Sequence, residues 1–201
     1  MDKDQEIYYG EFADLLEKIR DTVLKELEEM LNDLSTDPEH LPYEHINCRI
    51  KGVDSIREKL LRKGYPDDAL TGIRELSDVI GIRIVTHFVG DIYLILDRIR
   101  NHANWLVIRE KDYIAKPKEN GYRSFHIIIG VPVNTENLEH VKIELQLRTI
   151  AMDCWAALEH QMRYKKDVKN TALIASELKR CSDEMASTDL TMQTLRDVLS
   201  Q

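Results

Sequence analysis

The stretch Val141-Lys-Ile-Glu-Leu-Gln-Leu-Arg148 alternates apolar and polar residues without interruption. Because successive side chains of a β-strand point to opposite faces of a sheet, the apolar residues share one face and the polar residues share the other. The pattern predicts a strand that packs one face into a core. The opposite face carries Lys142, Glu144, Gln146 and Arg148. This polar face is either a solvated surface, as in many antiparallel sheets, or a site equipped for chemistry.

A second strand is predicted from Tyr122 to Val131, where β-branched residues are frequent. Within it Tyr122, Ser124 and His126 share one face. The preceding loop, residues 116–121, contains two lysines and a conformationally permissive glycine. A tyrosine, a hydroxyl and an imidazole beside a basic loop suit a nucleobase and its phosphates, although a tyrosine at a sheet edge is equally consistent with packing.

Two carboxylates on separate elements are candidate metal ligands. Asp78 precedes a strand predicted from Ile82 to Phe88, and Glu144 lies on the strand described above. Their oxygens would together suit Mg²⁺, with substrate phosphates completing the coordination shell. Asp78 is also an ordinary residue for a turn or a helix cap, so its position alone does not decide between the two interpretations.

Charge is unevenly distributed along the chain. The formal net charge is −8, but residues 1–47 hold 14 acidic and 4 basic residues, and the segment 49–63 is basic. A helix is predicted from Val53 to Arg62, with Ser55, Lys59 and Arg62 on one face and Lys51 near its start. Helix N-termini favour anions, so this segment suits a triphosphate; a solvated basic face is the alternative.

The remaining pattern predicts an α+β fold with a mixed sheet of about five strands. A long amphipathic helix is expected over 8–34, further strands over 47–52 and 105–108, and helices over 91–100, 152–162 and from 171 to the end. We expect one domain over 1–201: an N-terminal helical extension (1–46), a catalytic core (47–165) and a C-terminal helix (166–201). The terminal helices would pack on their own sheet or form subunit contacts.

Composition excludes several classes of protein. No signal-peptide pattern and no apolar run of membrane-spanning length is present, so we expect a soluble, cytoplasmic protein without a membrane partner. Three distant cysteines, Cys48, Cys154 and Cys181, support neither a disulfide framework nor a zinc site. The acidic charge argues against a stable nucleic-acid partner.

Four motifs in combination resemble the synthetase domain of the RelA/SpoT alarmone synthetases and, in length, the small alarmone synthetases. The resemblance runs from about Pro42 to Lys165. Its motifs are Arg49-Ile-Lys51, Asp78-Val-Ile-Gly-Ile-Arg83, Gly121-Tyr-Arg-Ser-Phe-His126 and Glu144-Leu-Gln-Leu-Arg-Thr149. It implies a sheet related to nucleotidyltransferases, a homotetramer formed through terminal helices, and transfer of pyrophosphate from ATP to the ribose 3′-hydroxyl of GDP or GTP.

The resemblance also implies roles for individual residues. Asp78 and Glu144 correspond to the magnesium ligands, and Glu144 to the group that takes the proton from the 3′-hydroxyl. The residues corresponding to the ATP site are Arg49 and Arg83, which sandwich adenine, and Lys51, Ser55, Lys59 and Arg62, which hold phosphates. The residues corresponding to the guanosine nucleotide site are Tyr122, which stacks on guanine, Lys118, His126, Gln146 and Arg148.

The chain departs from the family pattern at some positions. Lys111 stands where many relatives have an arginine, and no His-Asp dipeptide marks the hydrolase domain of the long members. We therefore expect a GTP pyrophosphokinase with neither a hydrolase nor a regulatory domain. Two alternatives stay open: a pyrophosphokinase with another acceptor, such as an adenosine nucleotide or a tRNA 3′ end, and a non-catalytic nucleotide-binding module.

Overall fold

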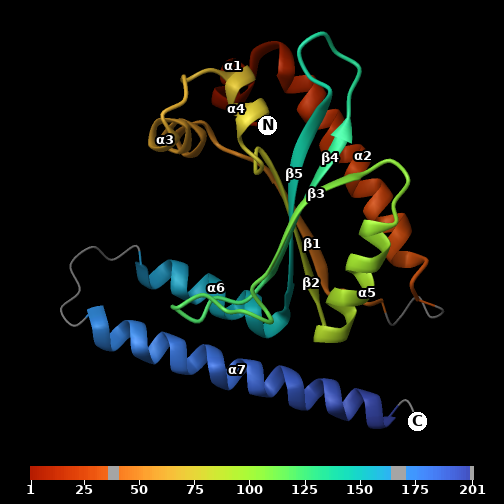
Figure 1. The fold of residues 1–201 in the computed structure, drawn as a ribbon, viewed down its shortest axis with the longest axis vertical. Helices are drawn as coiled ribbons and strands as arrows, with labels where there is room; N and C mark the ends of the chain where they lie inside the picture. The colour runs from red at the N-terminus through yellow and green to blue at the C-terminus, as the bar shows by residue number, and fades with distance from the viewer. Residues whose placement is uncertain (36–40, 164–170, 200–201) are drawn as a thin grey trace.

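A computed structural model describes residues 1–35, 41–163 and 171–199, and places five strands in one mixed sheet of order β1-β2-β5-β4-β3 (Figure 1). The strands are β1 (His45–Ile50), β2 (Ile80–Thr86), β3 (Leu106–Asp112), β4 (Phe125–Pro132) and β5 (His140–Thr149). The helices are α1 (Lys3–Tyr9), the 3₁₀ turn η1 (Gly10–Phe12), α2 (Ala13–Asn32), α3 (Val53–Lys63), α4 (Ala69–Glu75), α5 (Val89–Arg100), α6 (Ile150–Arg163) and α7 (Thr171–Leu199).

The central strand is β5, which confirms the strand predicted from strict alternation. It pairs in parallel with β2 and antiparallel with β4. The side chains of Val141, Ile143, Leu145 and Leu147 are fully buried in the core. The intervening polar residues lie on the other face, so the division of β5 into an apolar and a polar face is as predicted.

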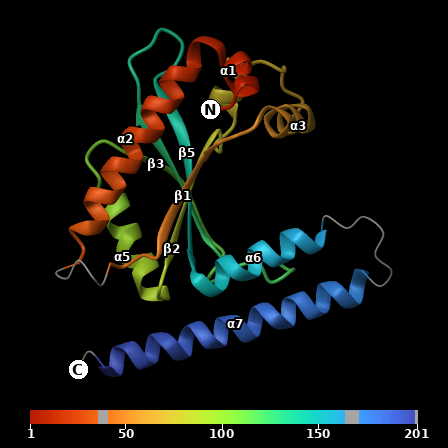
Figure 2. The same cartoon turned by 180° about the vertical axis from the view of Figure 1, so that it is seen from behind.

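Helices α2 and α5 supply much of the apolar layer that covers this core (Figure 2). The buried stripe of α2 includes Leu16, Val23 and Leu27, and that of α5 includes Ile92 and Ile99. α6 starts at the end of β5 and runs beside α7 across that end of the sheet (Figure 1). The stripes of α2 and α5 therefore pack with the apolar residues of β5, on the face opposite its polar residues.

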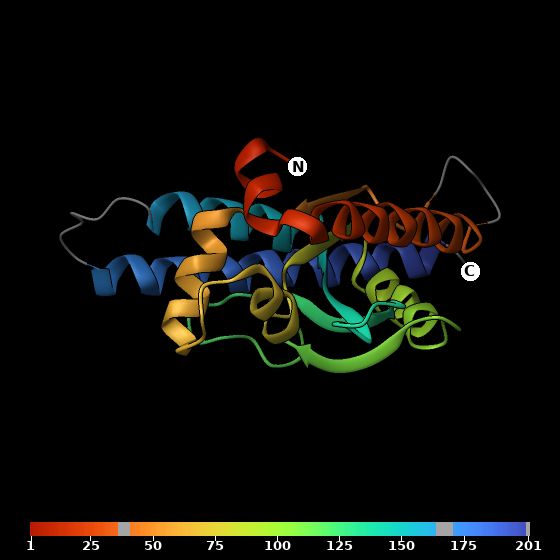
Figure 3. The same cartoon turned by 90° about the horizontal axis from the view of Figure 1, so that it is seen from above.

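α3 lies beside α4, away from the C-terminal end of α2 (Figures 1 and 3). The contact is close because Gly72 in α4 leaves room for Ile56 of α3; a Cβ at Gly72 would come within 2.7 Å of the Ile56 side chain. Packing on α4 fixes α3 next to the start of β2. The basic residues of α3 thereby come near the polar face of the sheet.

Several predicted boundaries were wrong for local reasons. The single helix expected over 8–34 is divided, because Gly10 ends α1 with a φ of +52°. α4 was not predicted; Asp68 caps it by accepting a hydrogen bond from the Thr71 amide. β4 starts only at Phe125, so Tyr122 and Ser124 lie in the preceding connection rather than on a strand face.

The two ends of the chain differ in how they use their apolar residues. The apolar stripe of α2 is buried in the core of its own chain, which agrees with the interpretation that the terminal helices pack on their own sheet. α7 instead exposes Leu190, Leu195 and Val198, which are 67%, 53% and 62% accessible. Within the described ranges, none of the helices is long and apolar enough to cross a membrane.

We predict that Leu145→Ala lowers the free energy of unfolding by about 2–5 kcal/mol, because it opens a cavity at the centre of the sheet. Urea denaturation followed by circular dichroism measures the change. Leu61→Ala is the control, since Leu61 is 81% accessible on α3. A change of equal size in both variants would contradict the placement of Leu145 in the core.

Candidate active site

Strand register brings the predicted site residues of four strands onto one face. Arg49 of β1 is paired with Gly81 of β2, which is paired with Glu144 of β5. A Cβ added to Gly81 would meet no atom within 4 Å, so the space between the two charged side chains is open. A second row of paired residues crosses the next four strands and consists of Arg83 of β2, Gln146 of β5, His126 of β4 and Lys111 of β3.

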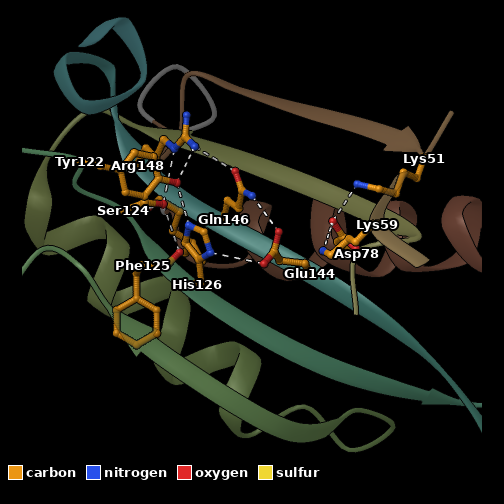
Figure 4. A network of polar contacts seen from close by, with 11 residues as sticks. Lys51, Lys59, Asp78, Tyr122, Ser124, Phe125, His126, Glu144, Gln146 and Arg148 are labelled. Atoms are coloured by element: carbon orange, nitrogen blue, oxygen red, sulfur yellow. Dashed lines mark hydrogen bonds and ion pairs between the residues drawn. The ribbon is translucent and has the colours of Figure 1, made fainter. Parts of the chain in front are cut away.

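Arg148 is the buried centre of the polar network on this face (Figure 4). Its Nη1 lies 2.9 Å from Asp153 Oδ1 at the start of α6. Its Nη2 donates to the Tyr122 hydroxyl at 2.7 Å and to Gln146 Oε1 at 3.0 Å. Its Nε donates to Ser124 Oγ at 3.4 Å. A guanidinium presents several donors in a fixed plane, which suits one side chain holding four partners.

Two of these partners, Gln146 and Tyr122, connect Arg148 to the Glu144 carboxylate. Gln146 Nε2 donates to Glu144 Oε2 at 2.8 Å. Along the other path, the Tyr122 hydroxyl lies 2.8 Å from His126 Nε2, and His126 Nδ1 lies 3.3 Å from Glu144 Oε1. In either protonation state of the ring Nδ1 can donate to Glu144: as a neutral imidazole, with Nε2 accepting from the Tyr122 hydroxyl, or as an imidazolium, with both ring nitrogens donating.

These contacts set the ionisation of Glu144. Burial raises the pKa of its carboxyl, but hydrogen bonds and charge from His126 and the hydrogen bond from Gln146 outweigh burial. The net pKa lies below the ordinary glutamate value. Glu144 is therefore held ionised and oriented at neutral pH, as a metal ligand requires.

Asp78 is held by two lysines from the neighbouring segment (Figure 4). Lys51 Nζ lies 2.9 Å and Lys59 Nζ 2.8 Å from its Oδ2. Burial raises the pKa of Asp78, but Lys59 and Lys51 together lower it below the ordinary aspartate value. The other oxygen, Oδ1, is buried and has no hydrogen-bond partner within the described residues, which leaves one oxygen ready for a cation.

Two cavities meet at Glu144. The first, which we call the β1–β2 cavity, has a volume of about 260 Å³ and is lined by Asn47, Cys48, Arg49, Asp78, Gly81, Ile82, Arg83, Glu144 and Gln146. The second, the β3–β4 cavity, has a volume of about 220 Å³ and is lined by Arg109, Lys111, Tyr113, Lys118, His126, Ile128 and Glu144. One carboxylate thus contacts both spaces, so ligands in the two cavities would meet at Glu144.

The predicted residues that line the two cavities are Arg49, Asp78, Arg83, Glu144, Gln146, Lys118 and His126. Four others contact these from outside the linings: Lys51 and Lys59 through Asp78, Tyr122 through His126, and Arg148 through Gln146. The last two, Ser55 and Arg62, lie apart. Ser55 lines a separate hollow between α1 and α3, and Arg62 is exposed near the end of α3. Neither lines the β1–β2 cavity. Tyr122 lies under two cations, with Lys118 Nζ 4.5 Å and the Arg148 guanidinium carbon 5.2 Å from its ring centroid.

Sequence reasoning missed three residues that the structure adds. Arg109 and Tyr113 line the β3–β4 cavity, and the cavity also contains Lys111, whose role the sequence left in doubt. Asp153 links Arg148 to Arg83, whose Nη1 lies 3.2 Å from its Oδ1. The alternation of Arg109 and Lys111 on β3 was an available signal; the position of Asp153 after a strand end was not.

The two carboxylates fit a magnesium site of the kind completed by substrate. The described residues contain no group of three or more His, Cys, Asp and Glu side chains that could hold a metal alone. Mg²⁺ is commonly bound by one or two carboxylates together with substrate phosphates and water. The unpaired Oδ1 of Asp78 and the ionised Glu144 beside the β1–β2 cavity meet that requirement.

The fold and the cations on this face suit a protein that binds phosphate-bearing ligands, and comparison with known proteins identifies the family. The pattern described as "Region found in RelA / SpoT proteins" matches residues 48–169. GTP pyrophosphokinase YwaC of Bacillus subtilis is 42% identical over 145 residues, which are 72% of this chain and 69% of that protein. GTP pyrophosphokinase YjbM of the same organism is 36% identical over 159 residues, 79% of this chain and 74% of that protein.

Solved structures agree over the whole fold. Small alarmone synthetase 1 from Bacillus subtilis bound to its product pppGpp matches with a TM-score of 0.80 and 33% identity, covering 100% of both chains. Small alarmone synthetase 2 from the same organism matches with a TM-score of 0.75 and 36% identity, covering 93% of this chain and 99% of that one. The chain belongs to the RelA/SpoT family, which confirms the resemblance and the fold class inferred from sequence.

We predict that Lys59→Met raises the pKa of Asp78, because it removes a cation that stabilises the carboxylate. Since the folded pKa of Asp78 is depressed, its ion pairs stabilise the protein above the unfolded-state pKa and are lost as pH falls through the folded value. NMR titration of the carboxyl carbon measures the shift. Lys63→Met, an exposed lysine on the same helix, should leave that pKa unchanged. A pKa equal to that of the unmodified protein in Lys59→Met would contradict the ion pair.

Proposed function

We propose that this protein transfers the β,γ-pyrophosphate of ATP to the ribose 3′-hydroxyl of GDP or GTP, giving ppGpp or pppGpp and AMP in the stringent response. The observation that carries the proposal is the position of Glu144 at the boundary of two cavities, each lined by cationic side chains. Two relatives named GTP pyrophosphokinases and a matching synthetase bound to pppGpp support it.

The β1–β2 cavity is the proposed site for ATP. Arg49 and Arg83 line it, and guanidinium planes can stack on adenine. Lys51 and Lys59 approach from the side of α3, where their charges would hold the phosphates. The phosphate-binding proposal rests on these lysines, which contact Asp78 at the rim of the cavity, rather than on Ser55, which lines a separate hollow, and Arg62, which is exposed near the end of α3.

The β3–β4 cavity is the proposed site for the acceptor. Three cations, Arg109, Lys111 and Lys118, line it and would neutralise the 5′-phosphates of GDP or GTP. Tyr122 is the proposed stacking partner of guanine, beside His126. Gln146 holds Glu144 by a hydrogen bond, and Arg148 holds the Tyr122 hydroxyl.

The chemistry follows from this arrangement. The acceptor 3′-oxygen attacks the β-phosphorus of ATP, the bond to the oxygen bridging the α- and β-phosphates breaks, and AMP leaves with that oxygen. Glu144 accepts the proton of the 3′-hydroxyl. Mg²⁺ held by Asp78 and Glu144 would neutralise charge on the transferred phosphates. Because such transfers depend on alignment and electrostatic stabilisation, the fixed carboxylate and surrounding cations are the main contribution of the chain.

We predict that Glu144→Gln lowers turnover by about 10²–10⁴-fold, since it keeps the side-chain volume but removes the proton acceptor and a metal ligand. Purified protein is incubated with ATP, Mg²⁺ and GDP, GTP or GMP, and the products are separated by anion exchange. Glu139→Gln, on the exposed connection to β5, is the control and should retain activity. Near-normal turnover of Glu144→Gln, or no AMP from the unmodified protein with any acceptor, would reject the proposal.

We predict that Asp78→Asn raises the Mg²⁺ concentration needed for half-maximal activity at least about tenfold, because a neutral amide replaces a charged ligand. The initial rate as a function of Mg²⁺ concentration at fixed substrates measures the change. Asp67→Asn, an exposed aspartate outside both cavities, is the control. An unchanged requirement for Mg²⁺ would remove Asp78 from the proposed metal site.

Subunit assembly and location are parts of the same proposal. The exposed apolar residues of α7 support a homotetramer formed through that helix, and α2 contributes less because its stripe is buried in its own core. Light scattering coupled to size-exclusion chromatography measures the mass. The proposed substrates are nucleotides of the cytoplasm, where we expect the protein to act.

A further inference from the structure

The connection between β3 and β4 carries side chains of the β3–β4 cavity but has little regular structure of its own. We call residues 113–124 the acceptor loop. Lys118 Nζ lies 4.7 Å from the ring centroid of Tyr113 and 4.5 Å from that of Tyr122, so one ammonium joins both sides of the loop. The ring of Tyr122 is held from the sheet by Arg148. The backbone of the acceptor loop needs a separate support.

That support comes from α7, a helix distant in sequence that runs beside α6 (Figure 1). Ser182 is buried, and its Oγ donates to the Gly121 carbonyl at 2.5 Å. Gly121 has a φ of +92°, and a Cβ there would lie 2.9 Å from the Ser182 Cβ and 3.2 Å from the Lys179 Cα. Position 121 therefore requires glycine for two reasons, the positive φ of its backbone and the close approach of α7.

Arg123 makes a second contact between the acceptor loop and α7, and it also joins the two ends of the loop. Arg123 Nη2 donates to Asp183 Oδ1 of α7 at 3.0 Å, and Arg123 Nη1 donates to the Ile114 carbonyl at 3.3 Å. On α6, Glu159 Oε1 accepts from Asn120 Nδ2 at 3.2 Å. These residues line neither cavity, so their contacts with the loop hold its backbone rather than a ligand.

We propose that Ser182 and Asp183 of α7 are positioning residues for the acceptor nucleotide, because they dock the acceptor loop and thereby orient Lys118 and Tyr122. The inference rests on the proposed function for the identity of the nucleotide. The inference predicts different effects on the two substrates. These residues of α7 support the acceptor side. On the ATP side the backbone at Lys51 is held by α1, where the Tyr9 hydroxyl donates to the Lys51 carbonyl at 2.8 Å. Loosening the contacts of Ser182 and Asp183 with the acceptor loop should therefore affect GDP and not ATP.

Steady-state kinetics of the full chain test this asymmetry. Ser182→Ala, which loses one hydrogen bond, and Asp183→Asn, which removes the charge that strengthens the bond from Arg123, should each raise the KM for GDP by about three- to tenfold and leave the KM for ATP within about twofold. Ser176→Ala is the matched control, because that exposed hydroxyl donates to the Leu173 carbonyl of its own helix. An equal rise in both KM values, or no rise for GDP in either variant, would overturn the inference.

Amide hydrogen exchange of residues 113–124 distinguishes failure of the docking from failure of the proposed function. Faster exchange of this segment in Ser182→Ala and Asp183→Asn, but not in Ser176→Ala, supports the docking even if the unmodified protein releases no AMP. Unchanged exchange rejects it. If loss of the buried Ser182 hydroxyl unfolds the protein, Asp183→Asn decides, because Asp183 is largely exposed and its removal costs little stability.

Discussion

The site depends on one buried guanidinium, that of Arg148. It lies at the end of β5 and joins Asp153 of α6, Tyr122 of the acceptor loop and Gln146 of its own strand. Through the last two it orients both oxygens of Glu144. A buried charge without its partners is costly, so these elements are constrained to meet at one point. The same contacts that stabilise the charge also determine where the carboxylate points.

The parallel pairing of β2 with β5 places the second carboxylate. β2 begins just after Asp78, so the pairing that sets Gly81 against Glu144 also brings Asp78 to the same end of the sheet. Gly81 leaves open space where any other residue would project a side chain between Arg49 and Glu144. The β1–β2 cavity therefore results from a strand register and an absent side chain, while two lysines keep Asp78 ionised at its rim.

The helices at the two ends of the chain have different relations to the two cavities. α1 holds the backbone at Lys51 through Gln5 and Tyr9, and α7 holds the backbone at Gly121 through Ser182. Both contacts fix main-chain atoms next to a functional side chain without entering a cavity. Each proposed substrate site is thus supported by an element remote from it in sequence.

The sequence by itself determined the α+β class, the two faces of β5 and the candidate pair Asp78 and Glu144, because alternation and β-branched runs are local signals that tertiary contacts did not override. It also carried the family resemblance. Only the tertiary structure decided that α2 is buried in its own core, that Ser55 and Arg62 lie outside the β1–β2 cavity, and that Arg109 and Asp153 belong to the site. Helix periodicity gives a face but not its partner, and hydrogen bonds between residues far apart in sequence leave no periodic pattern to read.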